Sequence, residues 1–181
     1  MVVFLLEEKS METFLKGILP KLMNSKDYIL IPHEGKDDLL KSIPIKLKAW
    51  NMPNTKFIIV HDQDSNDCME LKQQITDICE PYNRDVTIRI VCEELESWYF
   101  GDIGAVEKAY KKNLTKIRNK RKYSVPDSIR NPKEVLKRYI PELTQIEGAR
   151  RISSFIDVDN NKSHSFQVFW ESVKSSTKSD V

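Results

Sequence analysis

The sequence predicts an α/β protein with a mainly parallel sheet of about four strands, flanked by helices and followed by an α-helical C-terminal extension. Three observations support this prediction. Short apolar runs alternate with segments of helical periodicity over the first hundred residues. The run at residues 57–60 is apolar throughout, as expected for a strand covered on both faces. Beyond Gly101 the strand-like runs stop, and the chain becomes polar with short helical segments.

Strands are expected where short apolar runs occur, and helices where apolar residues recur every three to four positions. The expected strands lie at residues 2–6, 28–31, 57–60 and 86–91. The helices between them cover residues 11–22, 35–50 and 69–79. Ser10 is available as the N-cap of the first helix, and Pro44 predicts a kink or a restart in the second. Alternation of this kind favours right-handed parallel βαβ units.

The change in the sequence after Gly101 suggests how the chain is organised. Residues 1–101 are expected to form the α/β core, and residues 102–174 a helical extension packed on it. The stretch from about 113 to 130 is polar and basic without a clear period, so a mobile basic loop is expected there. Residues 175–181 are expected to form a flexible tail.

Composition narrows the class of protein. Of the 181 residues, 40% are hydrophobic and 31% are charged, which is typical of a soluble globular protein. No apolar run approaches the roughly 20 residues that span a bilayer. The first apolar segment has no basic lead and meets Glu7 at once, so no signal peptide and a cytoplasmic location are expected. The three cysteines have no C-x-x-C spacing, which argues against a disulfide framework or a zinc site.

The net charge is only +2, but the charges are unevenly distributed. Residues 61–102 contain eleven acids and three bases, whereas residues 108–138 contain twelve bases and two acids. The densest basic cluster consists of Lys116, Arg118, Lys120, Arg121 and Lys122. Its positive field is able to attract the phosphates of a nucleic acid. The alternative is that these side chains only solvate a helix and a loop, which is the usual role of a charged run.

Acidic side chains follow three of the expected strands at the point where each strand ends. They are Glu7 and Glu8 after the first strand, Asp62 and Asp64 after the third, and Glu93, Glu94 and Glu96 after the fourth. The carboxyl ends of parallel strands open onto a common crevice, so these acids can converge. Mg²⁺ is usually held by one or two carboxylates together with waters and substrate phosphates. The sequence therefore predicts a site for Mg²⁺ or Mn²⁺ at this edge of the sheet.

The acids after the first and third strands are expected to differ in role. Asp62 and Asp64 are two residues apart, so on a continuing strand both would face the same way and share one ion. Glu7 comes from a different strand and would complete a second metal site or serve as a general acid or base. Asp67 either joins the ligands or caps the following helix.

The acids after the fourth strand have a structural alternative. Glu93, Glu94 and Glu96 can favour the N-terminus of a helix through its dipole. For Glu94 this is the favoured interpretation, whereas for Glu96 metal ligation is weighed equally. Glu8 and Glu12 are expected to be solvated.

Other polar residues flank the predicted site. Lys36, directly after Gly35, would bring a cation to a scissile phosphate, and the glycine permits a close approach of the backbone. The pair lacks the spacing of a Walker A motif, so no ATP site is expected in this chain. His33 and His61 are either structural or contact the substrate.

Two further pairs of neighbouring residues are considered. Arg150 and Arg151 either clamp a phosphate or pair with the acidic face. Trp98 and Tyr99 are expected to lie in the core. The sequence leaves the oligomeric state open.

These residues together resemble a known family. A strand ending in glutamate, a helix, a strand, a Gly-Lys pair and a strand ending in Asp-x-Asp resemble the Toprim domain of topoisomerases, primases and OLD-type nucleases. More closely, and over nearly the whole chain, the sequence resembles a family of small bacterial Toprim-like proteins, a domain of unknown function. The phrases that carry this resemblance are LLEEKSMETFLKGILPKL, IPHEGKDDLLKSIPIKLKAW, HDQDSNDC, CEELESWYFGD and GARRIS. One departure is Glu8, which stands where many Toprim domains have glycine.

The resemblance implies a site and a cellular setting. In Toprim domains the glutamate and the Asp-x-Asp form the catalytic, Mg²⁺-dependent site, which implies these roles for Glu7, Asp62 and Asp64. In OLD-type nucleases an acid after a later strand contributes to a second metal site, and Glu96 matches this position best, with Glu93 next. Members of the resembled family are commonly encoded beside an AAA- or ABC-type ATPase in neighbourhoods suggestive of anti-phage defence, which implies an ATPase partner.

We therefore predict an Mg²⁺-dependent nuclease that acts on DNA or RNA as the effector of an ATPase-linked defence system. The expected catalytic residues are Glu7, Asp62, Asp64, Glu96 and Lys36. Phosphodiester cleavage needs charge stabilisation and an activated water, and metal ions held by carboxylates provide both. Two alternatives stay open: a non-catalytic module that docks on an ATPase, and a phosphoryl-transfer enzyme for a small phosphate ester. The basic stretch favours a polymer, because several cations are needed to neutralise several phosphates.

Overall fold

The computed structural model describes residues 1–177 and contains a four-stranded sheet in which neighbouring strands are parallel. The strands are β1 (Val2–Leu6), β2 (Tyr28–Pro32), β3 (Lys56–Asp62) and β4 (Asp85–Val91). Their order across the sheet is β2-β1-β3-β4. The predicted α/β fold class and parallel sheet are confirmed.

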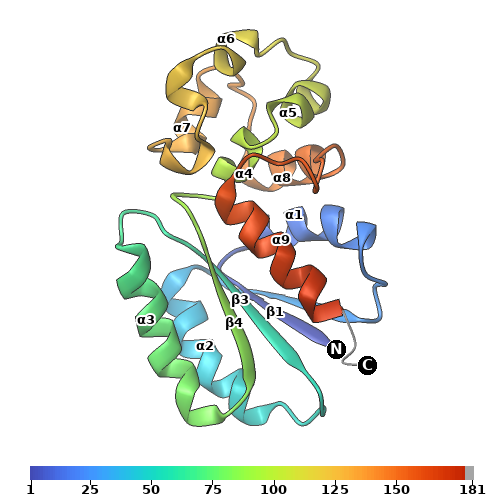
Figure 1. Ribbon diagram of the computed structural model, residues 1–181, viewed down its shortest axis with the longest axis vertical. Helices are drawn as coiled ribbons and strands as arrows, with labels where there is room; N and C mark the ends of the chain where they lie inside the picture. The colour runs from blue at the N-terminus through green and yellow to red at the C-terminus, as the bar shows by residue number, and fades with distance from the viewer. Residues whose placement is uncertain (178–181) are drawn as a thin grey trace.

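Helices cover both faces of the sheet (Figure 1). Helices α2 (Lys36–Ala49) and α3 (Cys68–Cys79) lie on one face, and helices α1 (Lys9–Ile18) and α9 (His164–Thr177) lie on the other. Side chains alternate along a strand, so Val3 and Leu5 join the core under α2 and α3, whereas Phe4 and Leu6 join the core under α1 and α9. This is why β1 is apolar and buried at every position.

Helix α1 differs from its prediction at both ends. It begins at Lys9 and ends at Ile18, and a 3-10 turn over Leu19–Lys21 follows because Pro20 has no backbone N–H to continue the α-helical ladder. The N-cap residue is Glu8, and Ser10 lies inside the helix, so the prediction of Ser10 as the N-cap was wrong. Helix α2 continues through Pro44 as a single helix.

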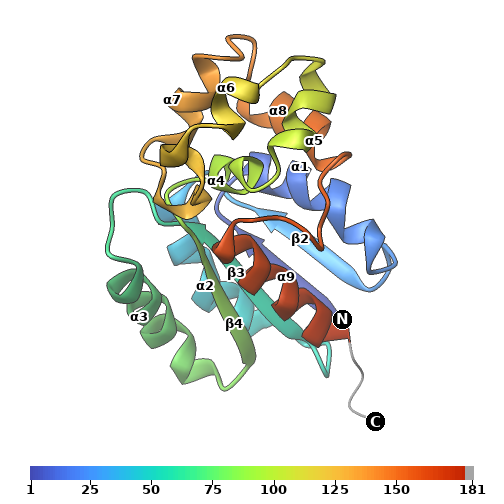
Figure 2. The same ribbon diagram turned by 45° about the horizontal axis from the view of Figure 1, so that its top comes forward.

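A group of short helices lies over the carboxyl ends of the strands (Figure 2). We call residues 96–153 the helical cap. It contains α4 (Glu96–Phe100), α5 (Ile103–Tyr110), α6 (Thr115–Arg118), α7 (Pro132–Lys137) and α8 (Gln145–Ser153). The stretch expected as a loop, 113–130, holds α6 and two 3-10 turns, and it is anchored by the buried side chains of Leu114, Ile117 and Ile129. The chain then returns along α9, which packs on the sheet itself.

An aromatic cluster joins the helical cap to the α/β layers. Trp98 of α4 is fully buried and stacks on Phe169 of α9 with ring centroids 5.0 Å apart. Its ring also lies 5.8 Å from that of Phe14 of α1. The indole N–H of Trp98 donates to Ser165 Oγ at 3.0 Å, which satisfies the polar end of the ring. These contacts confirm that Trp98 is a core residue, and they fix α4 above the sheet.

Three further observations concern the whole described chain. Within residues 1–177, the structure has no helix with the length and apolar character that a membrane span requires. All three cysteines are free thiols. Helix α9 extends to Thr177, so it includes the start of the predicted tail, and residues 178–181 of that tail lie outside the described residues.

Candidate functional site

Strands β1 and β3 are neighbours in the sheet, and the connections that follow them run to opposite sides. The chain passes from β1 to β2 on one side and returns to β3 on the other, and in open α/β sheets ligands bind in the crevice at such a switch point. Glu7 follows β1, and its N–H still donates to the Val60 carbonyl at 3.3 Å. Asp62 is the last residue of β3. The structure therefore places these two predicted acids on adjacent strands at one crevice.

Glu7 is held against the end of β3. Its Oε2 accepts a hydrogen bond from the backbone N–H of Asp62 at 2.9 Å, and Nδ1 of His61 lies 2.9 Å from the same oxygen. His61 is fully buried, and the same Nδ1 lies 2.5 Å from the Asp62 carbonyl oxygen. Among the described residues Glu7 Oε1 has no donor, so this second oxygen is available to a ligand.

Asp62 is buried without a partner for one of its oxygens. Only 8% of the residue is exposed, and Oδ1 accepts no hydrogen bond from any described residue. Burial, and then the nearby carboxylates of Glu7, Glu8 and Glu96, raise the pKa of Asp62 well above its ordinary value. The neutral form of Asp62 is favoured unless a cation enters the crevice.

Glu96 faces the same crevice from the first turn of α4. It is 5% exposed, and burial, followed by repulsion from Glu94, raises its pKa to about 7. Tyr99 lies one turn further along α4, and its buried hydroxyl has no partner among the described residues. Burial and then the charges of Glu96 and Asp62 raise the pKa of Tyr99 well above its ordinary value, so its hydroxyl stays protonated. The sequence indicated only a core role for Tyr99, although its i+3 spacing from Glu96 was a signal for a shared helix face.

Asp64 reaches the site by a different route from the one predicted. Strand β3 ends at Asp62, and Asp64 has a φ of +51°, so the alternation of a strand does not relate the two side chains. The turn is held to β4 because Gln63 N–H donates to the Val91 carbonyl and Asp64 N–H to the Glu93 carbonyl, each at 2.8 Å. Burial, and then the charges of Glu7 and Glu94, raise the pKa of Asp64.

Two predicted metal ligands have other partners. Oδ1 of Asp67 accepts from the N–H groups of Met69 and Glu70 at 2.8 and 3.0 Å, so Asp67 is the N-cap of α3. The structure therefore shows the capping role that the sequence offered as the alternative to ligation. Glu93 has a φ of +59°, and its carboxylate lies 3.5 Å from Arg130 of the helical cap.

The prediction that Glu12 is solvated was wrong, whereas Glu8 keeps part of its surface exposed. Glu12 is 6% exposed and pairs with Lys9 at 2.8 Å and Lys16 at 2.6 Å, because α1 begins at Lys9 and places all three on one face. Although burial opposes it, the hydrogen bonds from these lysines lower the pKa of Glu12. Glu8 is partly buried, accepts from the Ser10 hydroxyl and from Gln145 Nε2, and adds to the negative field at Asp62 and Glu96.

The charges of two lysines act on the acids. Lys36, at the start of α2, donates to Asn66 Oδ1 at 3.2 Å, and its charge offsets a small part of the rise that burial and nearby acids cause in the pKa of Asp64. Lys133, at the start of α7, lies 3.5 Å from Glu94, whose carboxylate also accepts from the Lys133 N–H at 3.2 Å. Burial alone would lower the pKa of Lys133, but the charges of Glu94, Glu96 and Glu8 raise it. Glu94 therefore pairs with Lys133, while its charge also acts on Asp64 and Glu96. The helix-dipole role favoured for Glu94 stays a prediction.

We call Glu7, Asp62, Asp64 and Glu96 the acidic cluster. As placed, no three His, Cys, Asp or Glu side chains within residues 1–177 are close enough to hold one metal ion. The donor set nevertheless fits Mg²⁺ or Mn²⁺, because such ions keep several waters and need only one or two carboxylates from the protein. The unpartnered Oδ1 of Asp62 and the free Oε1 of Glu7 are the oxygens best prepared for a cation.

The basic residues predicted to contact nucleic acid are exposed on the helical cap. They are Lys116, Arg118, Lys120, Arg121 and Lys122. Arg118 forms an ion pair with Glu107, and Lys120 donates to the Tyr139 hydroxyl at 3.2 Å. Of the two arginines on α8, Arg150 pairs with Glu147 at 3.0 Å and Arg151 pairs with the same carboxylate at 2.7 Å. Neither arginine pairs with the acidic cluster within the described structure.

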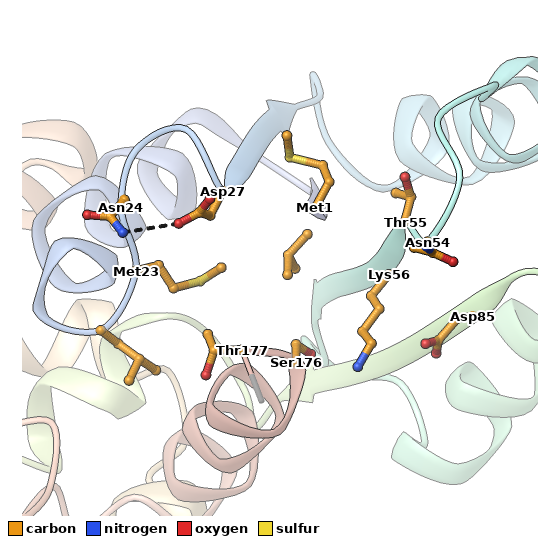
Figure 3. A pocket seen from close by; sticks show the side chains of 12 residues that line it. Met1, Met23, Asn24, Asp27, Asn54, Thr55, Lys56, Asp85, Ser176 and Thr177 are labelled. Carbon is orange, nitrogen blue, oxygen red and sulfur yellow. Dashed lines mark hydrogen bonds between the residues drawn. The ribbon is translucent and has the colours of Figure 1, made fainter. Parts of the chain in front are cut away.

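A pocket of about 890 Å³ lies at the other end of the sheet (Figure 3). It is bordered by Met1, by Lys56 and Asp85 at the starts of β3 and β4, and by Thr177 at the end of α9. Because these are the amino ends of parallel strands, this pocket is remote from the crevice that holds the acidic cluster.

Comparison with known proteins identifies the family and a similar fold. A model of DUF4276, a domain of unknown function, matches residues 6–174. The chain belongs to the DUF4276 family. No curated protein matches it in sequence. The structure of this DUF4276 chain is similar to the C-terminal region of the Burkholderia pseudomallei OLD protein, with a TM-score of 0.53 and 14% identity over 95% of this chain and 97% of that chain. The predicted likeness to OLD-type proteins is confirmed for the fold.

Proposed function

We propose that this DUF4276 chain is an Mg²⁺- or Mn²⁺-dependent nuclease that hydrolyses phosphodiester bonds in DNA or RNA. The observation that carries the proposal is a pair of buried carboxyl groups, Asp62 and Glu96, at the switch point. The charges of Glu7 and Glu96 both act on Asp62, and neither Asp62 nor Glu96 forms an ion pair in the described chain. Buried carboxylates without a counter-charge are costly. Carboxyl groups with pKa values perturbed in this way cluster at functional sites.

The residues of the crevice would have different roles. Glu7 and Asp62 would hold the cation, and Asp64 and Glu96 would complete its surroundings. The bound ion would stabilise charge on the phosphoryl oxygens and lower the pKa of a water. Glu96, with a pKa of about 7, is suited to accept and release a proton near neutral pH. Lys36 is placed at the edge of the crevice, where its charge can neutralise a substrate phosphate.

The substrate class is proposed from the charge of the helical cap. Five basic side chains are exposed between residues 116 and 122, and such a surface attracts a chain of phosphates more strongly than one small ester. The fold shared with the OLD C-terminal region supports a nuclease. An ATPase partner and a role in anti-phage defence are proposals that rest on the family resemblance alone.

The experiment is cleavage of end-labelled DNA and RNA by the purified protein with Mn²⁺ or Mg²⁺, compared with the same mixture in EDTA. Asp62→Asn keeps the shape of the protonated side chain, and Glu7→Gln keeps the shape of Glu7. Each should reduce cleavage by about 100-fold or more. The matched control is Asp159→Asn, at an exposed position between α8 and α9, which should cleave as the wild type does.

Two outcomes would contradict the proposal. One is cleavage that persists in EDTA or in Asp62→Asn. The other is a wild-type protein that cleaves neither polymer with the metal bound, both alone and with an ATPase partner added. The second outcome, with partner binding intact in Glu7→Gln, would favour the non-catalytic docking module.

A further inference from the structure

A small pocket opens beside the acidic cluster. Its volume is about 260 Å³, and it is bounded by the start of α1, the loop between β2 and α2, and the start of α8. Glu8 connects the two sites, because it lines the pocket and also raises the pKa of Asp62 and of Glu96. The volume is below the roughly 300 Å³ at which pockets for drug-sized ligands begin, so a phosphate group fits it better than a whole nucleotide.

Three helices begin at this pocket. Their N-cap residues are Glu8 for α1, Gly35 for α2 and Thr144 for α8, and none of these side chains caps its helix. The first N–H groups of each helix have no intrahelical acceptor and carry partial positive charge. Helix N-termini are established binding sites for anions. Three that face one pocket favour an anion there.

A buried histidine supplies an independent indication of a ligand. His33 lines the pocket, is 8% exposed, and places Nδ1 2.8 Å from the Leu6 carbonyl oxygen. Since a carbonyl oxygen only accepts, Nδ1 donates, and the other ring nitrogen remains for a second partner. That nitrogen, Nε2, is buried and has no partner among the described residues. A ligand in the pocket would supply the partner that Nε2 lacks.

Gly35 leaves the backbone open to the pocket. Its φ is +108°, which glycine adopts without strain, and a Cβ placed there would have no atom within 4 Å. Its N–H donates to the Glu7 carbonyl at 2.9 Å, so the start of α2 is tied directly to the first residue of the acidic cluster. The open space therefore lies over backbone that is fixed relative to the candidate metal ligands.

Two carboxylates line the pocket and oppose an anion. Glu8 is already engaged by the Ser10 hydroxyl and by Gln145 Nε2, the latter at 3.3 Å. Glu34 is exposed and free to turn toward solvent, while its N–H donates to Asp38 Oδ2 at 3.0 Å. The pocket thus keeps N–H donors from three helices, and one unpartnered histidine nitrogen, for a ligand.

We propose that this pocket binds a phosphate group of the nucleic acid next to the phosphodiester on which the acidic cluster acts. The inference rests on the proposed function for the identity of the substrate, but phosphate binding itself requires no metal ion. The phosphate comes either from the end of a strand or from an internal phosphodiester. Binding at this position would set which bond reaches the acidic cluster.

The test is titration of inorganic phosphate into the full chain in EDTA, followed through backbone amide resonances. Phosphate should shift the amides of the first turns of α1, α2 and α8. Ile146→Trp, at a 43% exposed position that lines the pocket, should fill it and weaken phosphate binding at least tenfold. Ile45→Trp, at a 65% exposed position on α2, is the matched control and should bind as the wild type does. Shifts confined to other regions, or unchanged binding in Ile146→Trp, would overturn the proposal.

Oligonucleotide competition distinguishes the two sources of phosphate. If a 5′-phosphorylated strand displaces phosphate and the same strand with a 5′-hydroxyl does not, the pocket takes a terminal phosphate. Equal displacement by both assigns the pocket to an internal phosphodiester, and displacement by neither rejects it as a substrate site. Asp62→Asn should retain phosphate binding in EDTA. Failure of the metal site and failure of the pocket are therefore separate results.

Discussion

Replacing Glu96 with glutamine should stabilise the metal-free protein above neutral pH. Glu96 is 5% exposed, and its pKa rises from an ordinary value of 4.5 to about 7 on folding. The folded state therefore binds more protons than the unfolded state between these two pH values. The stability of the wild type should fall as pH rises from about 4.5 to about 7 and then level off. At about 1.36 kcal/mol per pKa unit, the ionised Glu96 costs about 3 kcal/mol above pH 7.

The assay is urea unfolding followed by tryptophan fluorescence, in EDTA, at about pH 4 and about pH 8.5. At the higher pH, Glu96→Gln should be more stable than the wild type by about 3 kcal/mol, because the variant buries no charge. At the lower pH the two should differ by less than about 1 kcal/mol, since Glu96 is then protonated in both states. Glu80→Gln, at an exposed position after α3, is the control and should change stability little at either pH.

One result would refute this reasoning about burial and charge. If Glu96→Gln is as stable as the wild type at about pH 8.5, or less stable, Glu96 does not carry an uncompensated charge in the crevice. Adding Mn²⁺ to the wild type and to Glu96→Gln provides a second test. It should stabilise the wild type more than Glu96→Gln, because only the wild type offers a carboxylate at this position.

Three further predictions concern other parts of the structure. His61→Leu removes the ring nitrogen that lies 2.9 Å from Glu7 and donates to the Asp62 carbonyl, and it should weaken Mn²⁺ binding about 10- to 100-fold. His61→Asn, which keeps a donor, should lose less, and equal loss in calorimetry would reject a positioning role. Asp67→Ala removes the N-cap of α3 and should cost about 1 kcal/mol in urea unfolding without changing Mn²⁺ affinity, and a large loss of affinity would restore Asp67 as a ligand. Replacing all five residues of the basic cluster with glutamine should weaken nucleic-acid binding and flatten its salt dependence in fluorescence anisotropy. Unchanged binding would exclude the cluster from the nucleic-acid interface. The cluster consists of Lys116, Arg118, Lys120, Arg121 and Lys122.

The sheet and the first acids of the site could be predicted because their signals are local. Apolar runs such as residues 57–60 indicate buried strands, and the acids that follow them lie at the carboxyl edge of any parallel sheet. The N-cap of α3 could also be predicted as one of two roles for Asp67, because this residue lies just before a segment of helical periodicity. Its role had to be left open because capping and metal ligation favour the same residue type.

The remaining features depend on contacts between distant segments. A shift of two residues at the start of α1 is enough to bury Glu12 between two lysines. Asp64 adopts a positive φ at the end of β3, so the strand alternation assumed for it does not apply. Tyr99 joins the site because the stacking of Trp98 on α9 fixes α4 over the crevice, and the sequence alone contains no record of that packing. The pocket at the three helix N-termini likewise exists only in the folded chain.

The most direct test of the central claim is calorimetric titration of Mn²⁺ into the wild type, Asp62→Asn and Asp159→Asn at about pH 8, where Glu96 is ionised. If the acidic cluster is a metal site, the wild type and Asp159→Asn should bind Mn²⁺ with the same affinity, and Asp62→Asn should bind at least tenfold more weakly. Equal binding by all three proteins, or no binding by a folded wild type with and without nucleic acid, would contradict the assignment of this crevice as a metal site.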